Sequence, residues 1–257
     1  MNALENLVGG IVQKSVSVLD LTTPLTARTP VIQLPSPFAN TKGLQLEEIS
    51  RYDERGPAWY WNNFSMGEHA GTHFDAPIHW VTGKDGASVD RVPPAHLVAP
   101  AVVVDKTAEC AANPDFLLEV EHLEAWQRDH GPLPDGGWLL FRTGWESRAG
   151  DQAAFFNVDE RGSHTPGPSP DCARWLAQES PIVGFGVETV GTDAGMAGGF
   201  DPPFPCHNLM HGAGKYGLTS LVGLGELPAT GAVLIVAPLP IVGGSGSPAR
   251  ALALVAR

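Results

Sequence analysis

Four side chains suited to metal binding and proton transfer lie close together in the sequence. Residues 68–79 read Glu-His-Ala-Gly-Thr-His-Phe-Asp-Ala-Pro-Ile-His, which contains His69, His73, Asp75 and His79. Two neutral imidazoles and a carboxylate form a mixed nitrogen and oxygen donor set that suits Zn²⁺ or Mn²⁺. Three protein ligands leave coordination positions open for water and substrate, so this composition is typical of a catalytic rather than a structural metal site.

These residues can meet at one ion only if the backbone bends. In a straight strand, which rises about 3.3 Å per residue, His69 and Asp75 would lie roughly 20 Å apart. A helix is disfavoured, because Gly71 weakens it and a proline follows two residues after Asp75. We therefore expect a strand that ends near Glu68 and a turn at Gly71, where glycine supplies the unusual backbone dihedrals.

His79 has a different predicted role. It lies four residues after Asp75, beyond the proline that fixes the turn, where it can take a proton from a water held by the metal. The alternative is that these are unrelated loop histidines, which is the commoner case for any single histidine. Together around one glycine and one proline, they favour a catalytic metal site with His69, His73 and Asp75 as ligands and His79 as the base.

The elements that would position this site are mostly strands. Apolar runs, several of them rich in β-branched residues, alternate with glycine and proline turns along the chain, without a linker or an internal repeat. The predicted strands are Ser15–Leu21, Leu44–Ile49, Trp59–Met66, Leu97–Asp105, Trp138–Thr143, Ile182–Val187, Ala232–Leu239 and Ala249–Val255. Strands outnumber helices, so we expect an α/β or α+β fold in which a few helices cover a mostly β core, as a single domain over residues 1–257.

Two helices are well signalled, and a third is short. Asn113 begins the first, which a Gly-Pro pair ends at Gly131. Ser169 is the predicted N-cap of the second, with a proline at the first helical position, and this helix continues to about Gln178. The third covers residues 207–211.

The overall charge argues against several kinds of partner. The chain carries 28 acidic and 16 basic side chains, a formal net charge of −12. A surface that binds nucleic acid or anionic lipid needs a basic face, so we expect neither partner. The N-terminal stretch does not resemble a signal peptide, and no apolar run reaches the roughly 20 residues of a membrane helix, which favours a cytoplasmic location. Three cysteines without a C-x-x-C pair indicate neither a disulfide framework nor a cysteine-based zinc site.

The histidine-rich stretch resembles the hallmark of a known enzyme family. Residues 69–79 match every fixed position of H-x-G-T-H-x-D-x-P-x-H, the motif of the cyclase family of metal-dependent hydrolases, which includes bacterial kynurenine formamidases, isatin hydrolases and trans-dienelactone hydrolases. Weaker similarity extends along the chain. The resemblance implies a swivelling β/β/α fold, a homodimer or homotetramer, and a small-molecule substrate. It also implies His69, His73 and Asp75 as metal ligands and His79 as the acid and base.

One departure from the family pattern concerns a second metal. In kynurenine formamidases the shared aspartate, a later histidine and a glutamate hold it, and His207 matches that histidine. Thr219 and Ser220 stand where the glutamate is expected, and neither offers a carboxylate. We therefore expect one divalent metal per chain, Zn²⁺ or Mn²⁺, with His207 as a weak ligand, a substrate contact or a proton carrier through Ser220. Glu188 is either a replacement carboxylate or a structural hydrogen-bonding group.

Residues just before the motif are candidates for the substrate pocket. Trp59 and Trp61 share one face of a predicted strand and could wall a flat apolar pocket for an aryl or cyclic substrate, although core packing accounts for each equally well. Glu68 either orients a ligand imidazole or is a solvated charge.

Three functions fit these residues. The first, which we favour, is hydrolysis of a cyclic or aryl amide, imide or lactone, in which a metal-held water attacks the carbonyl and His79 transfers the proton. The second is a metal-dependent intramolecular condensation, as the family's name suggests. The third is a non-catalytic metal or small-molecule binding module, which His79 argues against because a binding site needs no additional base. Pocket-wall residues that no motif fixes decide the substrate.

Overall fold

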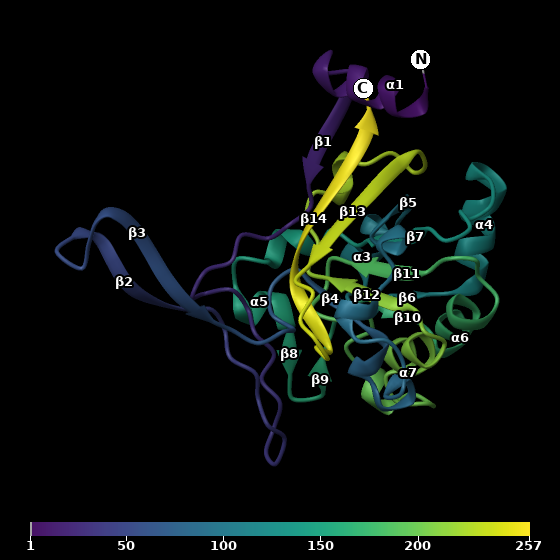
Figure 1. The fold of residues 1–257 in the computed structure, drawn as a ribbon. Coiled ribbons are helices and arrows are strands. Elements are labelled where there is room, and N and C mark those ends of the chain that lie inside the picture. Colours follow the sequence, from purple (N-terminus) through teal and green to yellow (C-terminus); the bar gives the residue numbers. More distant parts are fainter. Residues whose placement is uncertain (1) are drawn as a thin grey trace.

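The fold is built around a closed β-barrel. A computed structural model describes residues 2–257 (Figure 1). Its main sheet has the strand order β1-β14-β13-β5-β7-β11-β12-β4, and β14 also pairs with β4, which closes seven of these strands into a barrel and leaves β1 outside the ring. The strands are β1 (Val16–Asp20), β4 (His73–Asp75), β5 (Val98–Asp105), β7 (Trp138–Arg142), β11 (Gly184–Val187), β12 (Tyr216–Thr219), β13 (Ala232–Pro238) and β14 (Gly246–Ala256).

The sheet is mixed, with helices packed on its outer face. Strands β5, β7, β11 and β12 run parallel to one another, whereas β4, β13 and β14 pair antiparallel with their neighbours. The α-helices of residues 2–257 are α1 (Ala3–Val12), α2 (Pro94–Leu97), α3 (Thr107–Ala112), α4 (Val120–His130), α5 (Gln152–Phe156), α6 (Pro170–Gln178) and α7 (Pro205–Gly212). The predicted α/β class with a mostly β core is therefore confirmed, and the finer assignment to the swivelling β/β/α fold stays a prediction.

Alternation along each strand separates two apolar cores. In β7, Trp138 and Leu140 point into the barrel, whereas Leu139 and Phe141 point outward against α4, α6 and α7. All four side chains are fully buried. The continuous apolar run in this strand is thus explained by burial on both faces.

Most of the predicted elements are present, with one misplaced helix start. The second helix begins and ends as predicted, because Ser169 accepts a hydrogen bond from the N–H of Cys172 and Pro170 occupies the first turn. The first helix begins at Val120 and not near Asn113, so that prediction is wrong. Asn113 instead ends α3, and residues 117–118 form a short strand, β6, that pairs with β10 (Gly167–Pro168).

Strand β4 carries two residues of the predicted site. Phe74 lies inside the barrel with no exposed surface, so His73 and Asp75 must point to the opposite face, toward α7. The expected turn precedes them, since Gly71 has a φ of 66°. The preceding strand ends at Ser65, slightly earlier than predicted.

A long hairpin stands apart from the barrel. Strands β2 (Gln45–Asp53) and β3 (Gly56–Ser65) pair with each other and, within residues 2–257, with no other strand. Figure 1 shows the hairpin projecting sideways from the body of the molecule. Between residues 2 and 257, no helix combines the length and the apolar character needed to cross a bilayer.

Candidate metal centre

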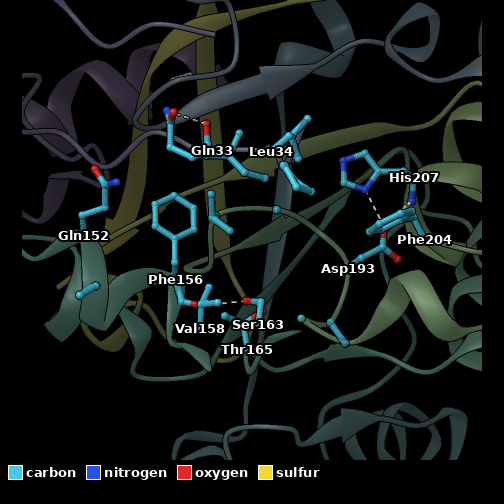
Figure 2. A pocket seen from close by; sticks show the side chains of 17 residues that line it. Gln33, Leu34, Gln152, Phe156, Val158, Ser163, Thr165, Asp193, Phe204 and His207 are labelled. Carbon is cyan, nitrogen blue, oxygen red and sulfur yellow. Dashed lines mark hydrogen bonds and ion pairs between the residues drawn. The ribbon is translucent and has the colours of Figure 1, made fainter. Parts of the chain in front are cut away.

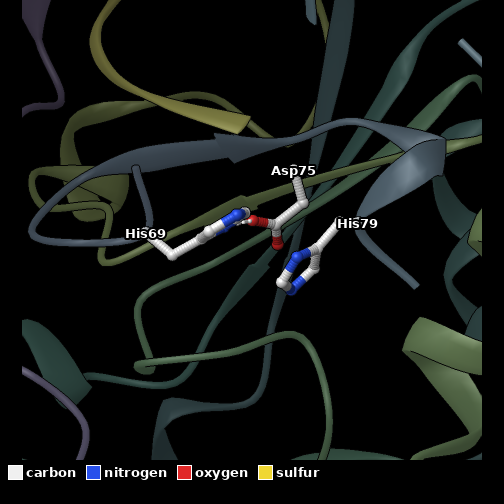
Figure 3. Close-up of side chains that lie close together, drawn as sticks. All are labelled: His69, Asp75 and His79. Carbon is white, nitrogen blue, oxygen red and sulfur yellow. Dashed lines mark hydrogen bonds and ion pairs between the residues drawn. The ribbon is translucent and has the colours of Figure 1, made fainter. Parts of the chain in front are cut away.

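The histidines and the aspartate of the motif lie close together beside the barrel, and Figure 3 shows His69, Asp75 and His79 of this cluster. Nδ1 of His69 lies 2.8 Å from Oδ1 of Asp75, and Nε2 of His73 lies 3.4 Å from the same oxygen. His79, at the end of the 3-10 helix η1 (Pro77–His79), stacks on His69 with ring centroids 3.9 Å apart. Ligand atoms of His69, Asp75 and His79 all lie within 4.8 Å of one another. The structure therefore brings all four predicted residues together.

Asp75 has the surroundings of a cation ligand. Its side chain is 1 % exposed, and no described residue donates a hydrogen bond to Oδ2. Its neighbours in register on β12 and β14 are Gly217 and Gly246. A Cβ at Gly217 would lie 2.7 Å from that same oxygen, so glycine keeps the space beside Oδ2 open. A buried carboxylate oxygen without a donor is costly unless a cation compensates it, so the site fits a divalent metal.

Protonation states at the cluster also suit metal binding. Burial raises the pKa of Asp75, but the adjacent histidines, His73 foremost, lower it by more, so the pKa of Asp75 lies well below its ordinary value. Burial lowers the pKa of His73, and it lowers the pKa of His79 to about 3. An ionised carboxylate among neutral imidazoles is the state in which all of these groups can donate lone pairs to a cation.

Partners outside the cluster fix the orientation of two imidazoles. The Ser245 hydroxyl donates to Oε2 of Glu68 over 2.6 Å and lies 2.8 Å from Nε2 of His69. His73 lies with Nδ1 2.8 Å from the carbonyl oxygen of Gly71 and 2.9 Å from the hydroxyl of Thr219, its register neighbour. Such partners hold a ligand ring in one orientation and are typical of metal sites.

Helix α7 contributes two more histidines to the same cluster. Asp193 accepts hydrogen bonds from the N–H groups of Cys206 and His207 at the start of the helix, and its Oδ2 also lies 2.5 Å from Nδ1 of His207. One turn later, the ring centroid of His211 lies 5.5 Å from that of His207 and 5.9 Å from that of His79. Ligand atoms of Asp75, His207 and His211 form a second group within 4.8 Å of one another.

The two histidines of α7 differ in charge. Burial lowers the pKa of His207, but its hydrogen bond to Asp193 and the negative charge of that carboxylate raise it by more, so the pKa of His207 lies above its ordinary value. Burial lowers the pKa of His211 to about 4. Nδ1 of His211 faces the carbonyl oxygen of Lys215, and its Nε2 has no hydrogen-bond partner among residues 2–257. His211 therefore presents a neutral, buried lone pair toward the cluster.

A cavity of about 570 Å³ opens beside His207 (Figure 2). Its volume is in the range of sites for small organic ligands. One wall comes from residues 32–35, which precede the hairpin, and another from residues 152–165 around α5. Phe156 and Phe204 supply aromatic surface, and Asp193 and His207 supply the polar end. The composition of the cavity suits a mostly apolar molecule with a polar group directed at Asp193 and His207.

Comparison with known proteins assigns the family. A family model described as "Putative cyclase" matches residues 19–194. The chain belongs to this family. It is 50 % identical over 257 residues to the isatin hydrolase of Roseibium aggregatum. The aligned region covers 99 % of this chain and 97 % of that relative. The prediction of a metal-dependent hydrolase of the cyclase family is thereby confirmed.

Solved structures of family members have the same fold. Isatin hydrolase A from Ralstonia solanacearum superposes with a TM-score of 0.96 at 52 % identity, covering 99 % of this chain and 98 % of that chain. An isatin hydrolase bound to the product analogue thioisatinate superposes with a TM-score of 0.97 at 49 % identity, covering all of both chains. The fold described above is therefore that of the isatin hydrolases of the cyclase family.

Among the other predicted site residues, several lie elsewhere. Trp59 and Trp61 lie on the exposed hairpin, and neither lines the cavity beside His207. Glu188 is fully buried, and its Oε2 accepts hydrogen bonds from the N–H and hydroxyl of Thr143 and from the N–H of Trp145, whereas its Oε1 has no hydrogen-bond partner among residues 2–257. Ser220 has a φ of 55°, and its carbonyl oxygen accepts a hydrogen bond from Thr72 of the motif.

Sequence reasoning missed the residues that support the site from a distance. Neither Ser245 nor Asp193 is among the predicted site residues. His211 carried a usable signal, because it lies four residues after His207 on one face of the predicted third helix. The register of β12 beside β4, which places Thr219 next to His73, had no signal in the sequence.

Proposed function

We propose that this chain hydrolyses the ring amide of an isatin-type cyclic aryl amide, using one divalent cation, Zn²⁺ or Mn²⁺. The observation that carries the proposal is the buried Asp75, whose Oδ2 lacks a donor in the described structure and faces neutral imidazoles. The full-length likeness to isatin hydrolases supports the choice of substrate. Opening the ring breaks the C–N bond, adds one water, and yields an amine and a carboxylate.

His69, His73 and Asp75 would hold the cation. When bound, a divalent cation lowers the pKa of water toward about 7 and polarises a carbonyl oxygen. Gly217 keeps the space beside Oδ2 of Asp75 open, and the Glu68 and Ser245 pair fixes the ring of His69. These residues prepare the site before substrate binds, so little reorganisation is needed during the reaction.

His79 is the proposed proton carrier. Because burial lowers its pKa to about 3, its imidazole is neutral near pH 7 and has a lone pair free to accept a proton. Its stacking on His69 keeps the ring beside the cation ligands. After accepting a proton from the attacking water, His79 returns it to the ring nitrogen as the C–N bond breaks.

His207 is proposed to contact the substrate rather than the cation. Asp193 raises its pKa and holds its Nδ1, which leaves Nε2–H to donate toward a carbonyl oxygen or the new carboxylate. It lies where the cavity meets the histidine cluster. The aromatic rings of Phe156 and Phe204 would pack against the aryl part of the substrate.

Metal analysis combined with turnover tests this function. The purified chain is expected to hold about one equivalent of a divalent metal and to open isatin faster than N-formylkynurenine, cyclic imides or dienelactones. Removal of the metal by a chelator should abolish turnover, and re-addition should restore it. Full activity in the metal-free chain would contradict the proposal, and a product whose mass lacks the added water would favour the condensation alternative.

A further inference from the structure

One wall of the cavity beside His207 is a very short hairpin. Strands β8 (Val158–Asp159) and β9 (Gly162–Ser163) pair with each other directly after helix α5. Val158 and Ser163 of this hairpin line the cavity, as does Thr165 just after it (Figure 2). An isolated two-stranded hairpin is at best marginally stable in water, so the shape of this wall depends on contacts with the rest of the chain.

A single imidazole joins this hairpin to a distant segment of the chain. His164 follows β9 directly, and its side chain is 9 % exposed. Its Nδ1 lies 2.8 Å from Oδ2 of Asp115, which precedes β6, and its Nε2 lies 3.0 Å from Oδ1 of Asp159 on β8. The ring therefore lies between a carboxylate of the hairpin and a carboxylate from 49 positions earlier in the sequence.

These two partners require the ring to carry a positive charge. An ionised carboxylate only accepts hydrogen bonds, whereas a neutral imidazole has one N–H donor and an imidazolium has two. Because both ring nitrogens face carboxylates, both hydrogen bonds form only while His164 is protonated. When the ring loses a proton, a nitrogen lone pair faces one of the two carboxylates, and the link across the ring is broken.

The nearest other cation does not replace this link. Arg161, in the turn of the hairpin, donates to Asp159 with its backbone N–H over 2.7 Å and with Nη2 over 3.1 Å. These contacts stay within the hairpin, so they hold Asp159 in place but do not tie the hairpin to Asp115. The hydrogen bonds to the two carboxylates, that to Asp115 foremost, raise the pKa of His164 above 6.5. The link is therefore complete below pH 6.5 and is lost as the pH rises through the raised value.

We propose that protonated His164 is a positioning residue, which fixes the β8–β9 wall of the cavity against Asp115 and thereby strengthens binding of the aromatic substrate. The role of the cavity as the substrate site rests on the proposed function. The same hairpin also fixes an aromatic part of the cavity, because the hydroxyl of Ser163 donates to the carbonyl oxygen of Phe156 over 2.8 Å. Since His164 bonds to the hairpin and to Asp115 rather than to the histidine cluster, it affects substrate binding and not the chemical step.

Isatin kinetics over a pH series test the proposal. At about pH 6, below the ordinary pKa of 6.5, His164→Gln should raise KM and leave kcat unchanged. The expected rise is about 3- to 5-fold, the upper part of the range for a partly exposed ion pair. The ratio of KM in the variant to KM in the wild-type chain should fall toward one as the pH rises through the raised pKa of His164. Groups that titrate in both chains cancel from this ratio.

Two further variants make the comparison specific. Asp115→Asn removes the other end of the link and should raise KM at about pH 6 as His164→Gln does. Combining the two changes should raise KM no further, because both act on one contact. His130→Gln, which removes a histidine at the exposed end of α4, is the matched control and should keep the wild-type KM at every pH. If His164→Gln fails to fold, Asp115→Asn supplies the same comparison.

Amide hydrogen exchange without substrate examines the wall itself. At about pH 6, residues 152–165 should exchange faster in His164→Gln and in Asp115→Asn than in the wild-type chain, whereas β7 in the barrel should exchange equally in all three. Mass spectrometry of peptides from each chain, compared at the same pH, measures this difference.

Several outcomes overturn the proposal. Equal exchange of residues 152–165 in the wild-type chain and both variants contradicts the link to Asp115. Faster exchange with an unchanged KM contradicts the effect on substrate binding. A KM ratio that stays equally high at every pH shows that the charge of His164 has no role. A wild-type chain that does not open isatin refutes the proposed function instead, and the exchange measurement then still decides whether the link exists.

Discussion

Strands β3 and β4 are close neighbours in the sequence but have opposite environments. Strand β3 exposes Trp59, Trp61 and Phe64 to solvent, whereas every residue of β4 is buried, including His73 and Asp75. The apolar strand lies outside and the polar strand inside. Each therefore departs from the ordinary distribution of side chains, in which apolar surface is buried and charge is solvated.

The two departures indicate two different missing partners. A contiguous apolar patch left uncovered marks an interaction site, so β3 indicates a contact surface. A buried carboxylate without a donor is compensated by a positive charge, so β4 indicates a cation. The short segment between the strands, residues 66–72, carries His69 and connects both features.

The largest effect is expected for the carboxylate that distinguishes β4. Asp75→Asn keeps the shape of the side chain but removes its charge, and it should reduce metal affinity by more than the roughly 100-fold that an outer-shell partner contributes. Turnover should be lost with the metal. Mass spectrometric metal analysis beside isatin kinetics measures both quantities. If Asp75→Asn retains a full equivalent of metal, the buried oxygen has another explanation and the comparison with β3 loses its basis.

His79→Ala separates binding from catalysis within the cluster. If His79 carries the proton, kcat should fall by about 10²- to 10⁴-fold while the metal content is unchanged. Ligand atoms of His79 lie within 4.8 Å of those of His69 and Asp75, so His79 is also within reach of a cation, which makes the result informative. A loss of metal in this variant would make His79 a ligand and would leave the base to be found on α7.

A smaller effect is expected from filling the space beside Asp75. Gly217→Ala would place a methyl group 2.7 Å from Oδ2, so the carboxylate must move, and metal affinity should fall roughly 10- to 100-fold. Gly150→Ala is the matched control, because a Cβ at Gly150 meets nothing within 4 Å. Titration with Co²⁺, followed by its visible absorption, measures the affinity directly. Equal affinities in the two variants would show that the open space has no role.

The smallest effect concerns a histidine that needs no metal. Nδ1 of His164 lies 2.8 Å from Asp115, and its Nε2 lies 3.0 Å from Asp159. These hydrogen bonds, that to Asp115 foremost, raise the pKa of His164 above its ordinary value of 6.5. The stabilisation is therefore complete below pH 6.5 and is lost as the pH rises through the raised value.

His164→Gln should therefore lower the melting temperature in mildly acidic buffer and have little effect well above the raised pKa of His164. Chelators should not alter this difference, because both ring nitrogens already have carboxylate partners. Thermal unfolding across a pH series, with and without chelator, measures it. If a chelator changes the difference in melting temperature between the wild-type chain and His164→Gln, His164 and its two aspartates bind a metal and are not simply an ion-paired group.

Much of the site follows from short-range sequence chemistry. Gly71 and the proline after Asp75 forced a bend, and the structure contains it at a φ of 66°. The strand limits in β5, β7 and β13 follow from apolar runs bounded by turns. The start of α4 was missed because Asn113 and its proline have the composition of a helix start, but tertiary pairing of β6 with β10 takes the residues that follow.

The sequence by itself determined which chemistry is available: imidazoles and one carboxylate at spacings that a single bend can bring together. Only the tertiary structure decided what surrounds them. The pairing of β4 with β12 on one side and with β14 on the other set a glycine on each side of Asp75. Helix α7 brought His207 and His211 from more than a hundred positions away in the sequence. The residues that wall the pocket and the exposure of the β2–β3 hairpin also could not be predicted. The local pattern of apolar and polar residues determines whether a segment is a helix or a strand, whereas the neighbours of that segment depend on contacts between distant parts of the chain.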